Sequence, residues 1–372
     1  VASFLAHYRQ SVHGLLPIWS HMANENWCMI GYHGASVIAD AYVKGIPMDE
    51  KLALEAVVST STVPYLEGLK ELGYVPMEKS GSSASVTLEY GYDDWAIYHM
   101  AKKMGDREVA DTYLKRAGAY KHLVDERLGF IRPKNAAGQM KEKFDVLDTH
   151  GQGFIEGNSW NYSFYVPQDV NGLKAFMGGD KRFIERLDSL FTMELPAKYY
   201  ENTEDITKEG LMGNYVHGNE PSQHIPYLYM WTSQPWKTQY RLREIMDRMY
   251  RNNIDGLCGN DDCGQMSAWY IFTAMGFYPV CPGSDQYVLG APYLKEMTVH
   301  LENGKDLVIK APKVSAKNRY VKSVKLNGRE YDKAYLTHQD ICNGGELFFE
   351  MSSTPNKKRV FTEEQKPYSM TK

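Results

Sequence analysis

Apolar residues recur every three or four positions along the first three quarters of the chain, which is the spacing of amphipathic helices. This pattern predicts an opening helix that ends before Gly14. It predicts nine further helices at about 31–45, 49–72, 86–104, 106–128, 159–178, 180–195, 222–233, 235–252 and 264–276. Asp49 is placed to cap a helix start, and Gly45 and Gly105 are placed to end helices. The helices follow one another in pairs with no repeat of fixed period, which favours an α/α toroid or an α-hairpin array over a solenoid.

The period changes after Pro279. Met297, Val299 and Leu301 alternate with polar residues, and Asn303-Gly304 separates them from a second apolar run. A similar stretch turns at Asn327-Gly328. Because Asn-Gly between alternating runs is a strong hairpin signal, a β-sheet layer is predicted here. The fold class is therefore mainly α with a C-terminal β layer, divided into a helical domain at 1–278, a β domain at 279–361 and a frayed tail at 362–372.

Composition excludes several classes of protein. The chain has 42 basic and 46 acidic residues, a net charge of −4, so it lacks the basic excess of a nucleic-acid-binding protein. No apolar run approaches the roughly 18 residues of a membrane span. Five scattered cysteines form no disulfide or zinc pattern. Aromatic residues make up 13% of the chain, which is compatible either with sugar binding or with a large core.

Carboxylates, amides and aromatic residues cluster in three segments, 154–162, 217–224 and 259–269, each near a predicted helix start. The carboxylates concerned are Glu156, Glu220 and the pair Asp261 and Asp262. Taken singly, each is more simply explained as a helix cap or a first-turn charge. Three such loops together instead suggest one convergent site at the mouth of a toroid.

Two carboxyl groups in an aromatic cleft suit glycoside hydrolysis. One protonated acid assists the leaving oxygen, and one carboxylate attacks the sugar or activates water. The oxygen ligands of the 217–224 segment also suit a hard cation such as calcium.

Long motifs in these segments resemble glycoside hydrolase family 92, the calcium-dependent exo-α-mannosidases. They are EGNSWNYSFYVPQDV, HGNEPSQHIPYLY and GNDDCGQMSAWYIFTAMGFYPVCPG, with upstream matches in CMIGYHGASVIADAYVKG and TLEYGYDDWAI. The resemblance runs from about Gly14 to Thr354. It implies an (α/α)6 barrel preceded by an N-terminal β-sandwich, calcium at the active site, and inversion at the anomeric carbon.

Carried onto this chain, the resemblance implies that Glu156 is the general acid and that Asp261 or Asp262 is the general base. Asn219 and Glu220 are the expected Ca²⁺ ligands. Residues expected to bind substrate are His33, Asp93, Asp94, Trp160, His217 and His224. For His33 a structural hydrogen bond is the simpler explanation, and for Asp93 and Asp94 buried capping is an equal alternative. Asn161 and Gln223 depart from the usual family residues, which leaves linkage preference open.

The resemblance also implies a setting. Ten predicted helices fall short of the twelve in a toroid, so the chain is expected to be the C-terminal portion of a longer enzyme, with the N-terminal β-sandwich region as its partner. The expected activity is hydrolysis of terminal α-1,2-linked mannose from N-glycans or mannans by a secreted or periplasmic bacterial enzyme. Two alternatives stay open. One is another (α/α)6 carbohydrate-active enzyme such as a phosphorylase, and the other is a non-catalytic glycan-binding fragment.

Overall fold

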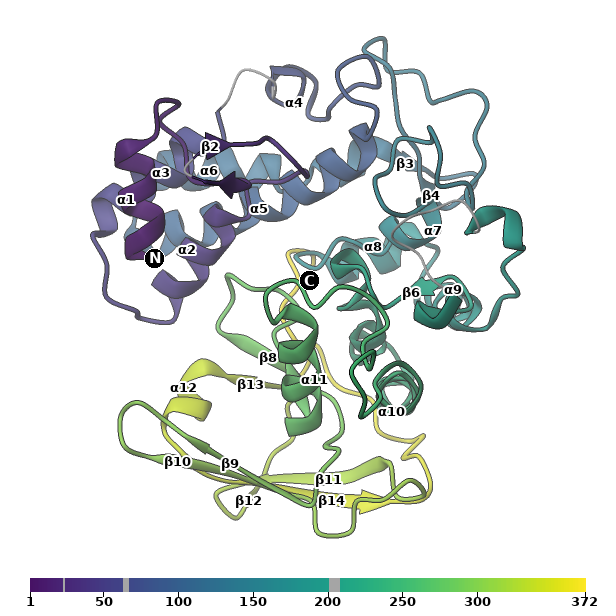
Figure 1. Cartoon of the computed structure of the whole chain (residues 1–372). Coiled ribbons are helices and arrows are strands. Elements are labelled where there is room, and N and C mark those ends of the chain that lie inside the picture. The colour runs from purple at the N-terminus through teal and green to yellow at the C-terminus, as the bar shows by residue number, and fades with distance from the viewer. Residues whose placement is uncertain (23, 63–66, 201–207) are drawn as a thin grey trace. The chain divides into compact units, whose positions relative to one another are not determined.

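The computed structural model describes residues 1–22, 24–62, 67–200 and 208–372, and it is mainly helical with β-sheets toward the C-terminus (Figure 1). The chain divides into two compact units. Unit 1 consists of residues 1–168 and 281–285, and unit 2 consists of residues 169–280 and 286–372. The predicted division at 278/279 separates helical from β structure, so it follows a different criterion and stays a prediction.

Unit 1 is helical with short strand pairs. Its elements are α1 (Ala2–Gln10), β1 (Ser20–His21), β2 (Asn24–Glu25), α2 (Gly34–Val43), α3 (Glu50–Thr60), α4 (Glu67–Leu72), α5 (Ser83–Met104), α6 (Arg107–Arg116), the 3₁₀ helix η2 (Ala119–Leu123), β3 (Val124–Asp125), β4 (Phe130–Ile131) and α7 (Ser159–Tyr162). Helix α5 packs against α2, α3 and α6. Most of its 22 residues are buried, as expected for a helix whose apolar residues lie all round it.

Local capping signals behave as the sequence predicts. The Asp49 side chain accepts a hydrogen bond from the backbone nitrogen of Leu52 at 3.1 Å, at the start of α3. Helix α5 ends at Gly105, which has a φ of +82°.

Three predicted helices are wrong in extent. The 49–72 helix is two helices, α3 and α4. The 106–128 helix stops at Arg116, and η2 follows after Gly118. The 159–178 helix is interrupted between Tyr162 and Val170, where Pro167 lacks the amide hydrogen that a continuous helix requires.

Among the described residues, unit 2 combines helices with three sheets, one of which is the two-stranded pair β5-β6. Its elements are α8 (Val170–Phe176), α9 (Asp180–Thr192), η3 (Ala197–Tyr199), η4 (Lys208–Gly210), β5 (Leu211–Met212), β6 (Tyr215–Val216), η5 (Glu220–Ser222), η6 (Ile225–Trp231), α10 (Trp236–Met249), α11 (Gln265–Met275), β7 (Phe277–Tyr278), β8 (Gln286–Leu289), β9 (Glu296–His300), β10 (Asp306–Lys310), β11 (Tyr320–Leu326), β12 (Arg329–Glu330), β13 (Tyr335–Thr337), α12 (His338–Cys342) and β14 (Gly345–Ser352). The predicted helix at 222–233 is the 3₁₀ helix η6, which has a proline in its first turn.

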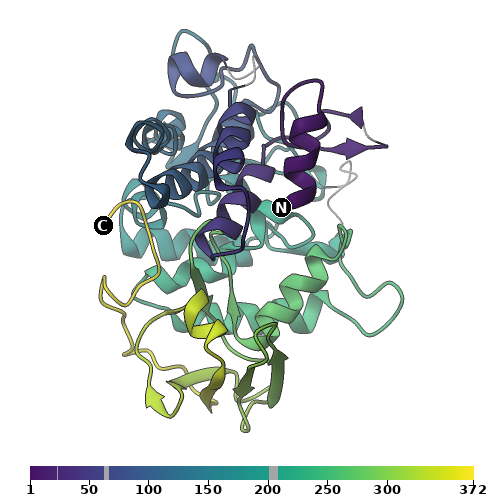
Figure 2. The ribbon, with the colours of Figure 1, turned by 90° about the vertical axis from the view of Figure 1, so that its left-hand side faces the viewer.

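The larger sheet has the strand order β12-β11-β14-β10-β9. Its strands are labelled in Figure 1 and are drawn in green to yellow in Figure 2. β10 and β14 are parallel, and the other neighbours are antiparallel. Asn327 and Gly328 join β11 to β12 with φ values of +52° and +77°, the conformation of a type I′ turn. A second sheet has the order β13-β8-β7.

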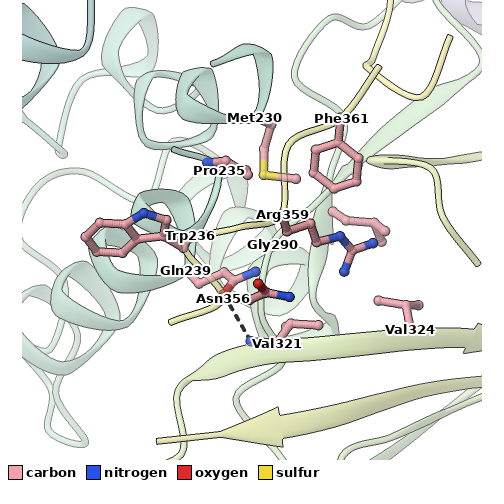
Figure 3. Close-up of a pocket in the computed structure, with 11 residues that line it drawn as sticks. Met230, Pro235, Trp236, Gln239, Gly290, Val321, Val324, Asn356, Arg359 and Phe361 are labelled. Atoms are coloured by element: carbon pink, nitrogen blue, oxygen red, sulfur yellow. Dashed lines mark hydrogen bonds between the residues drawn. The ribbon is translucent and has the colours of Figure 1, made fainter. Parts of the chain in front are cut away.

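Helix α10 contacts the larger sheet at β11. The backbone nitrogen of Val321 donates a hydrogen bond to Gln239 at 3.0 Å, beside Trp236 and Met230 (Figure 3). The cavity between them has a volume of about 20 Å³. That is space for about one water molecule and not for a sugar ring.

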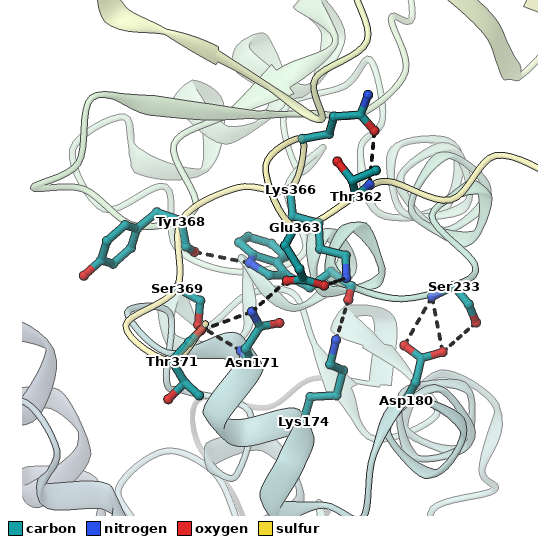
Figure 4. A network of polar contacts seen from close by, with 12 residues as sticks. Asn171, Lys174, Asp180, Ser233, Thr362, Glu363, Lys366, Tyr368, Ser369 and Thr371 are labelled. Carbon is teal, nitrogen blue, oxygen red and sulfur yellow. Dashed lines mark hydrogen bonds and ion pairs between the residues drawn. The ribbon is translucent and has the colours of Figure 1, made fainter.

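The last eleven residues are held in place by hydrogen bonds (Figure 4). The prediction that they form a frayed tail is therefore wrong. Asp169 accepts hydrogen bonds from Ser369 Oγ at 3.0 Å and from the Thr371 backbone nitrogen at 2.8 Å. Trp231 Nε1 donates to the carbonyl of Tyr368 at 3.2 Å. These contacts are made to residues about 140 to 200 positions earlier in the chain. The polar composition of the last residues alone does not reveal them.

Candidate functional site

The predicted site residues are shared between the two units. Unit 1 contains Glu156, His33, Asp93, Asp94 and Trp160, and unit 2 contains Asp261, Asp262, His217, Asn219, Glu220 and His224.

Glu156 occupies a loop that the fold constrains on both sides. Before it, the backbone nitrogen of Ile155 donates to Ser85 Oγ at 3.2 Å, which fixes the loop on α5. After it, α7 begins at Ser159, and the cap is Asn158. Glu156 therefore does not cap this helix. It has a φ of +51°, a left-handed conformation that is uncommon for a residue with a side chain and that concentrates at functional sites.

The residues after Glu156 anchor this loop to its neighbours in unit 1. Asn158 and Asn161 make a reciprocal capping box, so Asn161, the departure from the family pattern, is buried in a structural role. Ser159 Oγ donates to the Ile131 carbonyl at 2.7 Å. Trp160 is half-buried and makes an edge-to-face contact with Phe130, with ring centroids 4.9 Å apart.

His33 lies between two carboxylates of α5. Its Nδ1 is 2.9 Å from Asp93 Oδ1, and its Nε2 is 3.1 Å from Glu89 Oε2. Burial opposes a charge on the ring, but Asp93 and Glu89 outweigh it and hold the pKa of His33 well above its ordinary value. The side chain stays 43% exposed, and solvent weakens this effect. The exposed part of the ring leaves His33 able to contact a ligand.

Glu89 joins this group to the Glu156 loop. Tyr162, the last residue of α7, donates from its hydroxyl to Glu89 Oε1 at 3.1 Å. Burial raises the pKa of Glu89, against the influence of His33 and Tyr162. The His33 group and the 154–162 segment are thus connected within unit 1.

Asp94 is fully buried and has a basic partner that the local sequence does not show. Arg116 Nε donates to Asp94 Oδ2 at 2.8 Å, and the Tyr32 hydroxyl donates to Oδ1 at 2.6 Å. Burial raises the pKa of Asp94 to about 6, against the lowering influence of Arg116. Asp94 has no exposed surface, and its contact with Tyr32 supports the backbone next to His33.

In unit 2, His217 lies in an aromatic box. Its Nδ1 is 2.7 Å from the Tyr215 hydroxyl, its Nε2 is 2.7 Å from the Tyr250 hydroxyl, and its ring meets Trp269 edge-on. Burial lowers the pKa of His217 to about 3, so the ring is neutral. His217 has no exposed surface, which gives it the geometry of a buried support.

Two glycines bring the 217–224 and 259–269 segments together. A Cβ built on Gly259 would lie 2.8 Å from the Cα of Gly218, so neither backbone leaves room for a side chain at this crossing. Gln223 strengthens the contact: its Oε1 accepts from Gln265 at 2.5 Å, and its carbonyl accepts from Trp269 Nε1 at 3.0 Å.

The two candidate bases differ in their surroundings. Asp261 Oδ1 accepts from the backbone nitrogen and the hydroxyl of Ser267, at 3.0 and 2.8 Å, in the first turn of α11. Asp262 is exposed and has a φ of +46°. Asp261 therefore contacts the first turn of α11 through Oδ1, although the N-cap of that helix is Gly264.

The candidate calcium ligands lie side by side at η5. Asn219 is buried, Glu220 is exposed, and His224 is buried at the start of η6. Glu220 contributes to the raised pKa of Tyr278, after burial as the main cause. In the described ranges, no three His, Cys, Asp or Glu side chains form a group that could hold a metal ion, so a metal here would need amide, backbone or other oxygen donors as well. An amide and a carboxylate oxygen fit calcium better than zinc.

Sequence reasoning missed Glu89, Arg116 and Tyr250. Arg116 lies 22 positions from Asp94, and Tyr250 lies 33 positions from His217. The one available signal was Glu89 itself, because it precedes Asp93 by one helical turn in α5.

Comparison with known proteins identifies the family of this chain. Residues 1–353 match the glycosyl hydrolase family 92 catalytic domain. The chain belongs to glycosyl hydrolase family 92. The family 92 α-mannosidase of Bacteroides thetaiotaomicron is 44% identical, with a TM-score of 0.93 over 99% of this chain and 49% of that one. The same mannosidase is also known in complex with mannoimidazole.

Other relatives agree. A family 92 inverting mannosidase from the same organism is 39% identical, with a TM-score of 0.90 over 100% of this chain and 52% of that one. An uncharacterized secreted glycosidase of Arthroderma benhamiae is 27% identical over 90% of this family 92 chain and 46% of its own length. The chain thus spans about half the length of these relatives. In the described part of the chain, no helix has the length and apolar character needed to cross a membrane.

Proposed function

We propose that this chain carries the catalytic residues of an exo-acting α-mannosidase that removes terminal, α-1,2-linked mannose from N-glycans or mannans with inversion. The observation that carries this proposal is the placement of Glu156. The fold holds it in a constrained left-handed conformation next to α7 and assigns the capping of that helix to Asn158. The relative described as an inverting mannosidase supports the stereochemistry.

In this mechanism Glu156 is the general acid that protonates the leaving oxygen. Asp261 or Asp262 is the general base that takes a proton from water as the water attacks the anomeric carbon from the opposite face. Asp261 offers its second oxygen for this purpose, because Ser267 uses only Oδ1. His33 and Trp160 contact the sugar, while Asp93, Asp94, His217 and His224 position the segments around it.

Membership of family 92 supports the same proposal for the cofactor and the setting. Asn219 and Glu220 hold calcium, which supplies positive charge and orients sugar hydroxyls when bound. The helices form part of an (α/α)6 toroid, and an N-terminal β-sandwich region completes the enzyme. The relative named as a secreted glycosidase favours a secreted or periplasmic location.

The substitution Glu156→Gln tests the proposal. It should lower kcat/KM for natural mannobiose by about 10² to 10⁴-fold, because a poor leaving group needs protonation. An aryl mannoside with an activated phenolate should escape most of this loss. Asp261→Asn and Asp262→Asn should show which residue is the base, since loss of water activation affects both substrates equally.

Glu126→Gln, on an exposed carboxylate of unit 1, is the matched control and should leave both rates unchanged. Equal losses on both substrates for Glu156→Gln would assign the acid to another residue. Phosphate-dependent release of mannose 1-phosphate would indicate a phosphorylase, and binding without turnover in the full-length protein would indicate a glycan-binding function.

A further inference from the structure

Unit 2 has an open cleft of about 590 Å³ that none of the proposed roles uses. It lies between the end of α10, the loop that follows, and α11, and its walls include Tyr250, Tyr270 and Tyr293. The volume falls in the range of small-molecule sites.

Three tyrosine rings that contact one another in a row line the cleft. Tyr250 and Tyr270 have centroids 4.8 Å apart, and Tyr270 and Tyr293 have centroids 6.1 Å apart. All three side chains are half-buried, and Ile271 beside them is 52% exposed. The cleft therefore offers ring surface to a ligand, not only to the core.

The polar groups that line the cleft differ in their hydrogen bonding. Tyr293 donates from its hydroxyl to Asp247 at 2.8 Å, so those two groups are paired. Within the part of the chain that the structure describes, the Tyr270 hydroxyl and the side chains of Arg251 and Asn252 have no hydrogen-bond partner in the protein. These three groups are available to hydroxyl groups of a ligand.

The cleft adjoins a candidate catalytic residue. Ser267 is one of its lining residues, and its hydroxyl donates to Asp261 Oδ1 at 2.8 Å. A ligand in the cleft is thus one side chain away from the proposed base.

We propose that this cleft binds a pyranose ring of the glycan substrate other than the mannose that is cleaved. A neutral sugar with one apolar face and many hydroxyls matches tyrosine rings rimmed by an amide, a guanidinium and a phenol. An anion is a poorer match, since the single Arg251 lies in a cleft that also contains Asp247. This inference rests on the proposed mannosidase function and adds a substrate subsite to it.

The test compares two substrates on the full-length enzyme. Tyr270→Ala should raise KM for a branched oligomannoside about 3- to 10-fold, which corresponds to one lost ring contact. It should leave kcat/KM for an aryl mannoside unchanged, because that substrate has a single sugar. Asn252→Ala, an exposed position with little bearing on folding, should shift KM in the same direction. Tyr240→Ala, on α10 outside the cleft, is the matched control.

The outcomes separate this inference from the function on which it rests. Equal losses on both substrates would mean that the cleft only supports Asp261, and unchanged KM for the oligomannoside would mean that no glycan binds there; either result overturns the proposal. Absence of turnover of the aryl mannoside by the unmodified enzyme would instead refute the proposed function.

Discussion

His217 shows how a histidine in a functional motif takes a structural role. It begins the HGNEP motif, yet its two ring nitrogens are occupied by the hydroxyls of Tyr215 and Tyr250 and its ring is fully buried. One neutral ring can donate to one hydroxyl and accept from the other, whereas a protonated ring can only donate. Because the two hydroxyls can also accept from a protonated ring, it is the full burial of the ring that favours the neutral form.

This predicts an acid-sensitive step in stability. The pKa of His217 falls from 6.5 in the unfolded chain to about 3 in the folded one, so the unfolded state binds a proton first as the pH decreases. The neutral ring's stabilisation is present above pH 6.5 and is lost progressively below it. Between pH 7 and pH 5 this one residue should reduce the free energy of unfolding by about 2 kcal/mol.

Urea unfolding of the unmodified protein and of His217→Gln at the two pH values measures the effect. The difference between their pH dependences should be about 2 kcal/mol. His300→Gln, on a side chain that is 81% exposed, should retain the full pH dependence. A variant at position 217 that keeps the pH dependence of the unmodified protein would show that other groups cause it.

At the scale of helices and strands, local signals were sufficient where the deciding contact is local. Asp49 and Gly105 mark helix ends because their own backbone and side chains determine the cap. Asn327-Gly328 determines its turn in the same way. Apolar spacing continues past Pro167, where the missing amide hydrogen interrupts the predicted 159–178 helix. It also continues past Arg116, where α6 ends and the chain goes on as the 3₁₀ helix η2.

The site follows the same division. Glu156 and Asp261 stand out as candidates in the sequence because each lies in a dense local motif, and the contact of Asp261 with Ser267 is also local. The salt bridge from Arg116 to Asp94 and the Tyr250 contact to His217 join residues 22 and 33 positions apart, so they depend on packing that local sequence patterns do not reveal. The same limit explains why the tail was predicted to be frayed.

The calcium proposal for η5 can be tested directly by measuring metal binding. Titration of calcium into chelator-treated full-length protein should show a bound ion, and Asn219→Ala and Glu220→Gln should weaken binding by about 10- to 100-fold. Calcium should restore lost activity better than zinc, because the ligands are oxygen atoms. Glu209→Gln, on an exposed carboxylate of the same unit, serves as the control. Full turnover after chelation would contradict the assignment.

At the scale of the whole molecule, relatives that are matched over nearly all of this chain are about twice as long. Since we propose that an N-terminal region completes the enzyme, activity has to be measured with that region present. The stereochemistry of hydrolysis is the property that depends on the acid and the base at once. Inversion requires carboxyl groups about 6.5–9.5 Å apart so that water fits between base and sugar, whereas a retaining enzyme brings them to about 5–5.5 Å.

The proposed mechanism predicts that β-mannose is the first product released from an α-mannoside. Water attacks the face opposite the leaving group, so the configuration at the anomeric carbon inverts once. Proton NMR of the anomeric signals within the first minutes of hydrolysis distinguishes the two anomers before mutarotation equilibrates them. A parallel sample of the Glu156→Gln variant with an activated aryl mannoside should give the same β-anomer, since loss of the acid changes the rate and not the direction of attack. Early accumulation of α-mannose would instead require a covalent intermediate, and Asp261 or Asp262 would then be a nucleophile and not a base.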